Sequence, residues 1–277
     1  MNVFYGKKIA HNANSVRCAI QQILNIMNSI TPEDIKRVSN VIFTSNLFGK
    51  DDLTNCWIAE KVENGSKYIV GQHGGSYLEW YDKYSRVEYD TCDYFLSWGK
   101  KKRLDNKKVI PMFNFTLLDK KIKNIDKNLI IISKSMGSWD NHWDRWIYGK
   151  KVYSDCNILI RNLTKNIQNK TVYKLHHNYK KGYFRVLDNL IKNNKNIKID
   201  YYSNFLEIIK DSRLIIFDDY STGFLQSLNL NLKTVCFLPH KDTLFHRENK
   251  KDIKPLLKNK IIFYDIYKLI NHINNNW

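Results

Sequence analysis

The segment "RLIIFDDYSTGFLQSLNLNLKTVCF", from Arg213 to Phe237, contains two apolar strand patterns with a helix pattern between them. A β-branched run ends in the polar turn "DDYST", a short helix pattern follows, and a second β-branched run closes the segment. Two strands joined through a helix are typical of a parallel βαβ unit, because parallel strands need a long crossover connection. The segment therefore predicts an α/β fold.

The same alternation of strands and helices continues on both sides of this segment, from about residue 119 to the end. Such an alternation predicts a parallel sheet with helices on both faces, which is a Rossmann-like domain. We expect strands at 128–135, 171–177, 196–202, 213–217, 233–238 and 260–264, and helices at 182–193, 204–212, 222–230 and 265–274.

The first hundred residues repeat this organisation less completely. A helix is predicted around 16–27, a second helix begins at the N-cap Thr31, and strands follow in "NVIFTS", "KYIVG" and "YFLSWG". The basic, proline-containing stretch 100–113 is the predicted linker. We therefore expect two Rossmann-like lobes, a short or incomplete N-terminal lobe at 1–112 and a C-terminal lobe at 119–277.

The charge of the chain favours anionic partners. A net charge of +18 arises from 45 Lys+Arg against 27 Asp+Glu, which would suit nucleic acid, phosphorylated substrates or an acidic membrane surface. Much of this charge is Lys beside many Asn and Ile, a bias that A/T-rich codons also produce. No helix-turn-helix, RRM, KH or zinc pattern is present, so a nucleic-acid-binding protein is the weaker alternative and no nucleic-acid partner is expected.

The cysteines and the N-terminus bear on the compartment. The five cysteines are far apart and form no C-x-x-C pair, so we expect core thiols in a reducing compartment rather than disulfides or a zinc site. The N-terminus lacks the apolar segment of a signal peptide, and no run approaches the roughly 18 residues of a transmembrane helix. These features predict a cytoplasmic protein.

The first candidate site follows the strand pattern in "KYIVGQHGGSYLEW", residues 67–80. Gln72, His73, Gly74 and Gly75 come at the carboxyl end of that strand, where ligands bind in open α/β sheets. Paired glycines let backbone N–H groups approach a ligand, and a neutral imidazole is a base near pH 7. The alternative is a tight turn with a surface histidine.

The second candidate site is the helix start formed by Ser221, Thr222 and Gly223. The N–H groups of a helix start and the positive end of its dipole make an anion-binding site, to which a phosphate would fit. The alternative is that Ser221 or Thr222 only caps the helix. Neither G-x-G-x-x-G nor G-x-x-x-x-G-K-[ST] is present, so the sequence supports neither a dinucleotide fold nor a P-loop.

The third candidate site lies in "TVYKLHHNYKKGYF", where Lys174, His176 and His177 end a strand pattern. Alternation sends Lys174 and His176 to one face and His177 to the other, which makes a poor metal chelate. A clamp for phosphate or carboxylate and a plain solvated basic loop both remain open for this segment.

Two blocks of the sequence resemble a known family. "GSKYIVGQHGGSY", followed by "CDYFLSWG", and the later "SRLIIFDDYSTGFLQSLNLNLKTVCFLP" resemble a bacterial family of surface-carbohydrate transferases with the two-domain GT-B glycosyltransferase fold. That family is distantly similar to the capsule Kdo transferases. The chain departs from the family at Gln226, where the family has Glu, and at Lys233, where it has Pro.

The resemblance implies a glycosyltransferase that moves a sugar from a nucleotide donor, such as a CMP-activated Kdo-like acid, to a cell-surface polysaccharide or lipid-linked acceptor. The amides of 221–223, with Lys174 and His176, would hold the donor phosphate, and Gln226 would contact the ribose. No metal or other cofactor is expected, because a helix start and cations can replace a divalent ion. The excess of Lys would suit a peripheral position on an acidic membrane.

The N-terminal lobe would form the acceptor side, with His73 as the base or as a group that positions the donor sugar. Because this lobe is short for the family, a non-catalytic partner of a larger transferase is an alternative. The supporting residues expected are Gln72, Gly74 and Gly75 as hydrogen-bonding groups, with Asp93 and Glu79 as reserve carboxylates.

Overall fold

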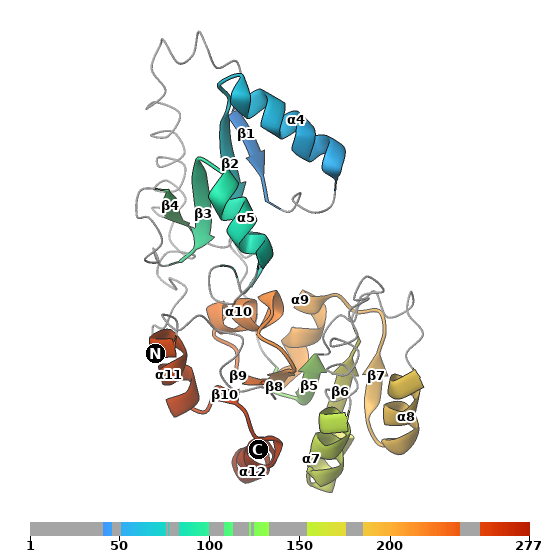
Figure 1. Ribbon diagram of the computed structural model, residues 1–277. Coiled ribbons are helices and arrows are strands. Elements are labelled where there is room, and N and C mark those ends of the chain that lie inside the picture. Colours follow the sequence, from blue (N-terminus) through green and yellow to red (C-terminus); the bar gives the residue numbers. More distant parts are fainter. Residues whose placement is uncertain are drawn as a thin grey trace. The chain divides into compact units, whose positions relative to one another are not determined.

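The computed structural model of the chain forms two compact units, Met1–Lys120 and Lys121–Trp277, which we describe separately (Figure 1). The structure describes residues 41–45, 51–75, 77, 83–99, 108–112, 122, 125–132, 154–175, 185–238 and 250–277, without the side chains of 83–86, 185–188 and 250.

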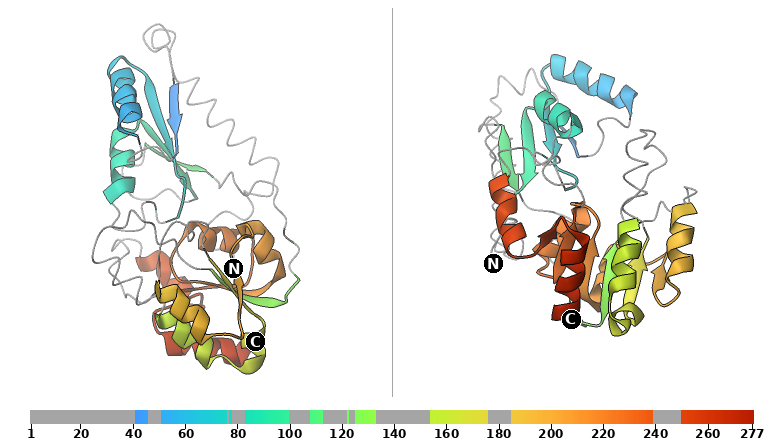
Figure 2. Two further views of the ribbon diagram at one scale, coloured as in Figure 1. Left: turned by 90° about the vertical axis from the view of Figure 1, so that its right-hand side faces the viewer. Right: turned by 60° about the horizontal axis from the view of Figure 1, so that its bottom comes forward.

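The N-terminal unit contains a four-stranded parallel sheet in the order β1-β2-β3-β4. Each strand is added on the same side of the previous one, so right-handed crossovers place the connecting helices on one face. Figure 2 shows α4 and α5 together on that face. The elements are β1 (Val41–Thr44), α4 (Asp52–Glu63), β2 (Lys67–Gly71), α5 (Lys83–Thr91), β3 (Tyr94–Trp98) and β4 (Val109–Met112).

Side chains that alternate along the strands form the core of this unit. The helix-covered face buries one cluster, and the opposite face buries a smaller one formed by Ile69, Leu96 and Met112. The larger cluster consists of Ile42, Ile58, Tyr68, Val70, Tyr89, Cys92, Phe95 and Val109.

The linker predicted at 100–113 is wrong over its last residues, which form β4. This strand pairs with β3 and buries Val109 and Met112. Pro111 is exposed within it, and a proline is tolerated because β4 ends the order of strands in this sheet. A basic stretch with a proline therefore predicts a linker even where its last residues form an edge strand.

The C-terminal unit contains a six-stranded parallel sheet in the order β10-β9-β8-β5-β6-β7. This is the doubly wound Rossmann order, in which the chain first builds outward from β5 to β7 and then returns to add β8 on the other side of β5. The carboxyl ends of β5 and β8 therefore form the topological switch point, where ligands bind in such sheets. The strands are β5 (Asn128–Ile132), β6 (Thr171–Lys174), β7 (Lys198–Asp200), β8 (Ser212–Phe217), β9 (Thr234–Phe237) and β10 (Ile262–Phe263).

Helices cover both faces of this sheet, as Figure 1 shows for α9 and α10 on one side and α7, α8 and α12 on the other. The second face carries a large core cluster, to which the helix at 154–162 also contributes. The helices are α7 (Lys165–Asn169), α8 (Arg185–Asn193), α9 (Phe205–Ile208) with the 3-10 turn η3 (Ile209–Asp211), α10 (Thr222–Asn229), α11 (Lys250–Lys258) and α12 (Ile266–Asn276).

The predicted fold class, α/β with two Rossmann-like lobes, is confirmed. Each strand predicted between 128 and 264 overlaps a strand of the sheet. The helices α4, α5, α7 and α11 and the helix at 154–162 were not predicted. In α4 the apolar pattern is blurred, because Leu53 and Trp57 are exposed while Ile58 alone is buried.

The prediction of core thiols holds for three cysteines and is wrong for a fourth. Cys92, Cys156 and Cys236 are buried and free, and burial raises the pKa of the Cys92 thiol to about 11. Cys56 is also free but lies exposed on α4. The three buried thiols behave as small apolar side chains rather than as nucleophiles.

Candidate functional site

The turn after β2 is fixed by the side chain of Gln72. Its Nε2 donates to the carbonyl oxygen of Gly74 at 2.7 Å, and its Oε1 accepts from the Trp98 N–H of β3 at 2.7 Å. Its backbone N–H donates to the Leu96 carbonyl at 2.8 Å. Gln72 therefore ties the His-Gly-Gly turn to the neighbouring strand, and both ends of its amide group already bind within the protein.

His73 is exposed beside this turn, and its ring is held by Tyr77. The Tyr77 hydroxyl hydrogen bonds with His73 Nδ1, and the two rings meet edge to face with centroids 4.9 Å apart. Tyr77 in turn stacks on the fully buried Phe95 with centroids 5.9 Å apart. The imidazole is therefore oriented by a side chain that is itself anchored on the core.

Gly74 is buried and Gly75 half-buried in the same turn. Among the described residues, the glycines with positive φ are Gly65 and Gly99, so the turn does not depend on left-handed backbone at this pair.

Asp93 lies at the wrong edge of the sheet for the catalytic role predicted for it. It directly precedes β3, where its carboxylate accepts from the Tyr68 N–H at 2.8 Å and pairs with Lys67 at 3.6 Å. His73 follows β2, and the strands are parallel, so the two residues occupy opposite edges. This position supports a structural role for Asp93. The other reserve carboxylate, Glu79, lies outside the described residues.

In the C-terminal unit, the turn after β8 leads into α10 at the switch point. Ser221 occupies the N-cap with extended backbone, φ −97° and ψ 173°, but its side chain makes no capping hydrogen bond. By contrast, the N-cap side chains of Asp51, Asn204 and Asp265 accept from backbone N–H groups of their helices. The alternative that Ser221 only caps its helix is therefore wrong, and its hydroxyl provides no acceptor for the amides at 222–224.

Gly223 lets the first turn of α10 lie close against the end of β8. A Cβ atom at this position would stand 2.9 Å from Cε1 of Phe217 and 3.4 Å from Cε2 of Phe205. Packing thus explains the glycine. Gln226 lies one turn after Thr222 on the same helical face and is half-buried.

Asp218 is a buried carboxylate beside this turn that was not among the predicted site residues. It directly follows β8 and is 3% exposed. Burial, and then the charge of Asp218, raises the pKa of Cys156 in the helix at 154–162, so this carboxylate lies near that helix. The "DD" pair that ends the apolar strand was the available signal. A buried carboxylate at the switch point can accept hydrogen bonds from hydroxyl or amino groups of a ligand.

Lys174 does not form the predicted phosphate clamp, because Asp200 already binds it. The ammonium lies 3.0 Å from Asp200 Oδ1, and the two side chains are only 11% and 16% exposed. Burial alone would raise the pKa of Asp200, but hydrogen bonds from Ser203 and Lys174 outweigh it and lower that pKa. The clamp is corrected to an internal ion pair that joins the ends of β6 and β7. His176, the other predicted member, lies outside the described residues.

Comparison with protein families identifies the chain. The model of the LIC12162 family transferase matches residues 17–277, which is nearly the whole sequence. The chain belongs to the LIC12162 family of transferases. No curated protein matches the sequence significantly.

Solved structures resemble this LIC12162 family transferase at low sequence identity. A protein from Listeria monocytogenes assigned as a UDP-N-acetylglucosamine 2-epimerase has a TM-score of 0.51 and 11% identity, covering 90% of this chain and 68% of its own. TarM has a TM-score of 0.49 and 11% identity, covering 85% of this chain and 48% of its own. A complex of S. aureus TarM with fondaparinux, alpha-GlcNAc-glycerol and UDP has a TM-score of 0.46 at 10% identity, covering 76% of this chain and 44% of its own. The chain thus spans about half the length of TarM.

Two observations concern metals and membranes. Within the described parts of this family member, no group of three or more His, Cys, Asp or Glu side chains is placed to hold a metal ion. None of the helices in the described ranges is long and apolar enough to cross a bilayer.

Proposed function

We propose that this LIC12162 family transferase moves a glycosyl group from a nucleotide sugar to a surface-carbohydrate acceptor. The nucleotide binds at the switch point of the C-terminal unit. The observation that carries this proposal is the Rossmann strand order, which puts the start of α10 beside the carboxyl ends of β5 and β8 without a side-chain cap from Ser221. Membership of a transferase family and a fold shared with a protein assigned as a sugar-nucleotide epimerase support it.

The departing nucleotide phosphate carries negative charge that the site must stabilise. Since Lys174 is paired with Asp200, the backbone amides of 222–224 and the positive end of the α10 dipole perform this task. Gln226 is placed one turn further along α10 to hydrogen bond a ribose hydroxyl. The resemblance to Kdo transferases supports a CMP-activated acidic sugar as the donor, with no metal or other cofactor.

His73 accepts the proton of the acceptor hydroxyl or positions the donor sugar. When its Nδ1–H donates to the Tyr77 oxygen, its Nε2 carries the lone pair that a base requires. Tyr77 is the positioning residue in this scheme. Tyr77→Phe should lower kcat and move the pH profile of kcat, while KM for the donor stays unchanged.

A thermal-shift screen against CMP, UDP, GDP and their sugars tests the nucleotide site, because a ligand that binds only the native state stabilises it. One nucleotide at about 100 times its Kd should stabilise the protein by about 2.7 kcal/mol. Failure of every nucleotide to raise Tm would overturn the proposal and favour a non-catalytic partner of a larger transferase.

Thr222→Pro sharpens this test. Thr222 is the first residue of α10 and follows a residue with extended backbone, so a proline is accommodated there while one N–H is removed. Thr222→Ala keeps the N–H and is the matched control. Nucleotide affinity should fall about tenfold in Thr222→Pro relative to Thr222→Ala. Equal affinities of the two variants would exclude this amide as a phosphate ligand.

A further inference from the structure

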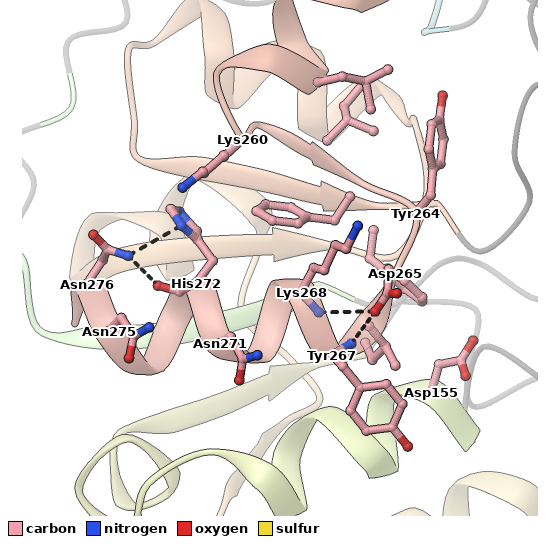
Figure 3. Close-up of a pocket in the computed structure, with 15 residues that line it drawn as sticks. Asp155, Lys260, Tyr264, Asp265, Tyr267, Lys268, Asn271, His272, Asn275 and Asn276 are labelled. Atoms are coloured by element: carbon pink, nitrogen blue, oxygen red, sulfur yellow. Dashed lines mark hydrogen bonds between the residues drawn. The ribbon is translucent and has the colours of Figure 1, made fainter.

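A groove of about 780 Å³ runs along α12 in the C-terminal unit (Figure 3). Its volume falls in the range of ordinary ligand sites. It runs from Lys260, which precedes β10 at the amino edge of the sheet, to Tyr264 and Asp265, which follow β10 at the carboxyl edge. Its lining includes Lys260, Lys268 and His272, the carboxylates Asp155 and Asp265, and the neutral polar side chains Tyr267, Asn271 and Asn275.

One side of this groove is cationic. Lys268, His272 and Asn276 recur every four residues along α12 and so share one helical face. Lys260 comes from the turn between α11 and β10 and lies beside His272 (Figure 3). Within the described residues, neither Lys260 nor Lys268 forms an ion pair, so both charges are available to a ligand.

The backbone at Lys260 supports a role for its side chain beyond the fold. Lys260 has a φ of 56° and occupies the left-handed position of a Schellman motif, with Lys260 N–H donating to Leu257 O at 3.1 Å and Ile261 N–H to Leu256 O at 2.8 Å. A lysine is disfavoured at such a position, where glycine is favoured.

The same motif ends two other helices of the protein with more suitable residues. Gly65, with a φ of 94°, ends α4, and Asn231, with a φ of 59°, ends α10. Both glycine and asparagine adopt left-handed backbone readily. The turn after α11 thus differs from its two counterparts because its left-handed residue is a lysine. The side chain of this lysine lines the groove.

A second set of side chains along α12 suits sugar hydroxyls. Tyr267, which is 60% exposed, is followed at intervals of four by Asn271 and Asn275, both exposed. An exposed tyrosine ring offers an apolar face to a pyranose, and each amide offers both a donor and an acceptor. In Figure 3 these three side chains follow one another along the helix.

We propose that this groove binds an acidic oligosaccharide, with an anionic group between Lys260, Lys268 and His272 and neutral sugar units along Tyr267, Asn271 and Asn275. The inference goes beyond the transfer reaction and does not depend on nucleotide binding at the switch point. Nucleotide binding to α10 and glycan binding to α12 can therefore fail separately.

The titration of His272 gives a signature of such a complex. Burial, and then the charge of Lys260, lowers the pKa of this imidazole. The ring packs on Phe263 at 5.3 Å, and its other polar neighbours are Asn276 and, one turn earlier on α12, Lys268. An anion between the cations favours the imidazolium, so glycan affinity should increase as pH falls from 7.5 to 5.5, a range chosen to span the ordinary histidine pKa of about 6.5.

The test is calorimetric titration of the full chain with a sulfated heparin hexasaccharide, with maltohexaose as the uncharged comparison. Lys260→Gly should weaken hexasaccharide binding about tenfold. It should leave Tm unchanged or raise it by about 2 °C, because glycine suits the left-handed position. Lys254→Gln is the matched control, since Lys254 is an exposed cation of α11 that does not line the groove.

Three outcomes would overturn the proposal. Equal loss of affinity in Lys260→Gly and Lys254→Gln would show attraction to the net charge of +18 rather than a site. Equal affinities for maltohexaose and for the sulfated hexasaccharide would show that the groove does not select an anionic group. An NMR titration in which saturating hexasaccharide leaves the pKa of His272 unchanged would place the ligand elsewhere.

Discussion

The carboxyl ends of β6 and β8 lie on the two sides of β5, and the sequence predicted anion binding at both. After β6 the predicted cation, Lys174, is held by Asp200 at 3.0 Å. After β8 the side chain of Ser221, for which capping was the alternative to anion binding, makes no capping hydrogen bond to α10. A polar group at a strand end thus becomes available to a ligand only when the neighbouring strand does not already bind it.

Removal of Lys174 should give the largest effect on stability. Lys174→Ala leaves Asp200 largely buried without its ammonium partner, so the free energy of unfolding should fall by about 3 kcal/mol in urea denaturation. Adding Asp200→Asn should recover part of that loss. The control Lys170→Ala, at an exposed turn, should change stability by less than about 0.5 kcal/mol. If Lys174→Ala left the free energy of unfolding unchanged, Lys174 would again be a candidate phosphate ligand.

A methyl group at Gly223 should have the next largest effect. Gly223→Ala brings its Cβ atom within 2.9 Å of the Phe217 ring, and the overpacking should cost about 2 kcal/mol in thermal or urea unfolding. Gln226→Ala, one turn later on α10 and half-buried, is a control for general sensitivity of the helix. Unchanged stability with lost nucleotide binding would instead assign the glycine to the ligand rather than to packing.

Low pH should weaken the ion pair at the end of β6, and the resulting loss of stability should be smaller than the losses in the two variants above. The folded-state pKa of Asp200 is lowered from 3.8, so the ion pair contributes its full stability above that value and loses it as pH falls through the folded pKa. Stability should therefore decline below about pH 4 more steeply in the parent chain than in Asp200→Asn. Parallel declines in urea midpoints measured between pH 5 and 2.5 would contradict the role given to this pair.

The sequence predicted the strands of the C-terminal sheet well, because their β-branched runs are bounded by polar turns that local patterns reveal. It could not predict that Lys174 and Asp200 stand opposite each other in the β6–β7 register, because that pairing joins residues far apart in the chain. For the same reason, the sequence could not predict that Gln72 Oε1 accepts from the N–H of Trp98 on the neighbouring strand. The sequence predicts where a strand ends, but the side chains that bind the residues at that end come from adjacent strands and depend on the fold.

The smallest expected effect lies at Ser221. Since its side chain caps nothing, Ser221→Ala should change the free energy of unfolding by a few tenths of a kcal/mol at most, whereas a capping residue contributes about 1 kcal/mol. Asn204→Ala at the start of α9 is the matched comparison, because Asn204 accepts from the Glu207 N–H at 2.9 Å within a capping box. Equal losses in the two variants, measured by urea unfolding without nucleotide, would show that the Ser221 hydroxyl caps α10 in solution. Ser221 would then hold an N–H of the first turn of α10 within the protein, as Asp200 holds Lys174, and the two sides of the switch point would no longer differ.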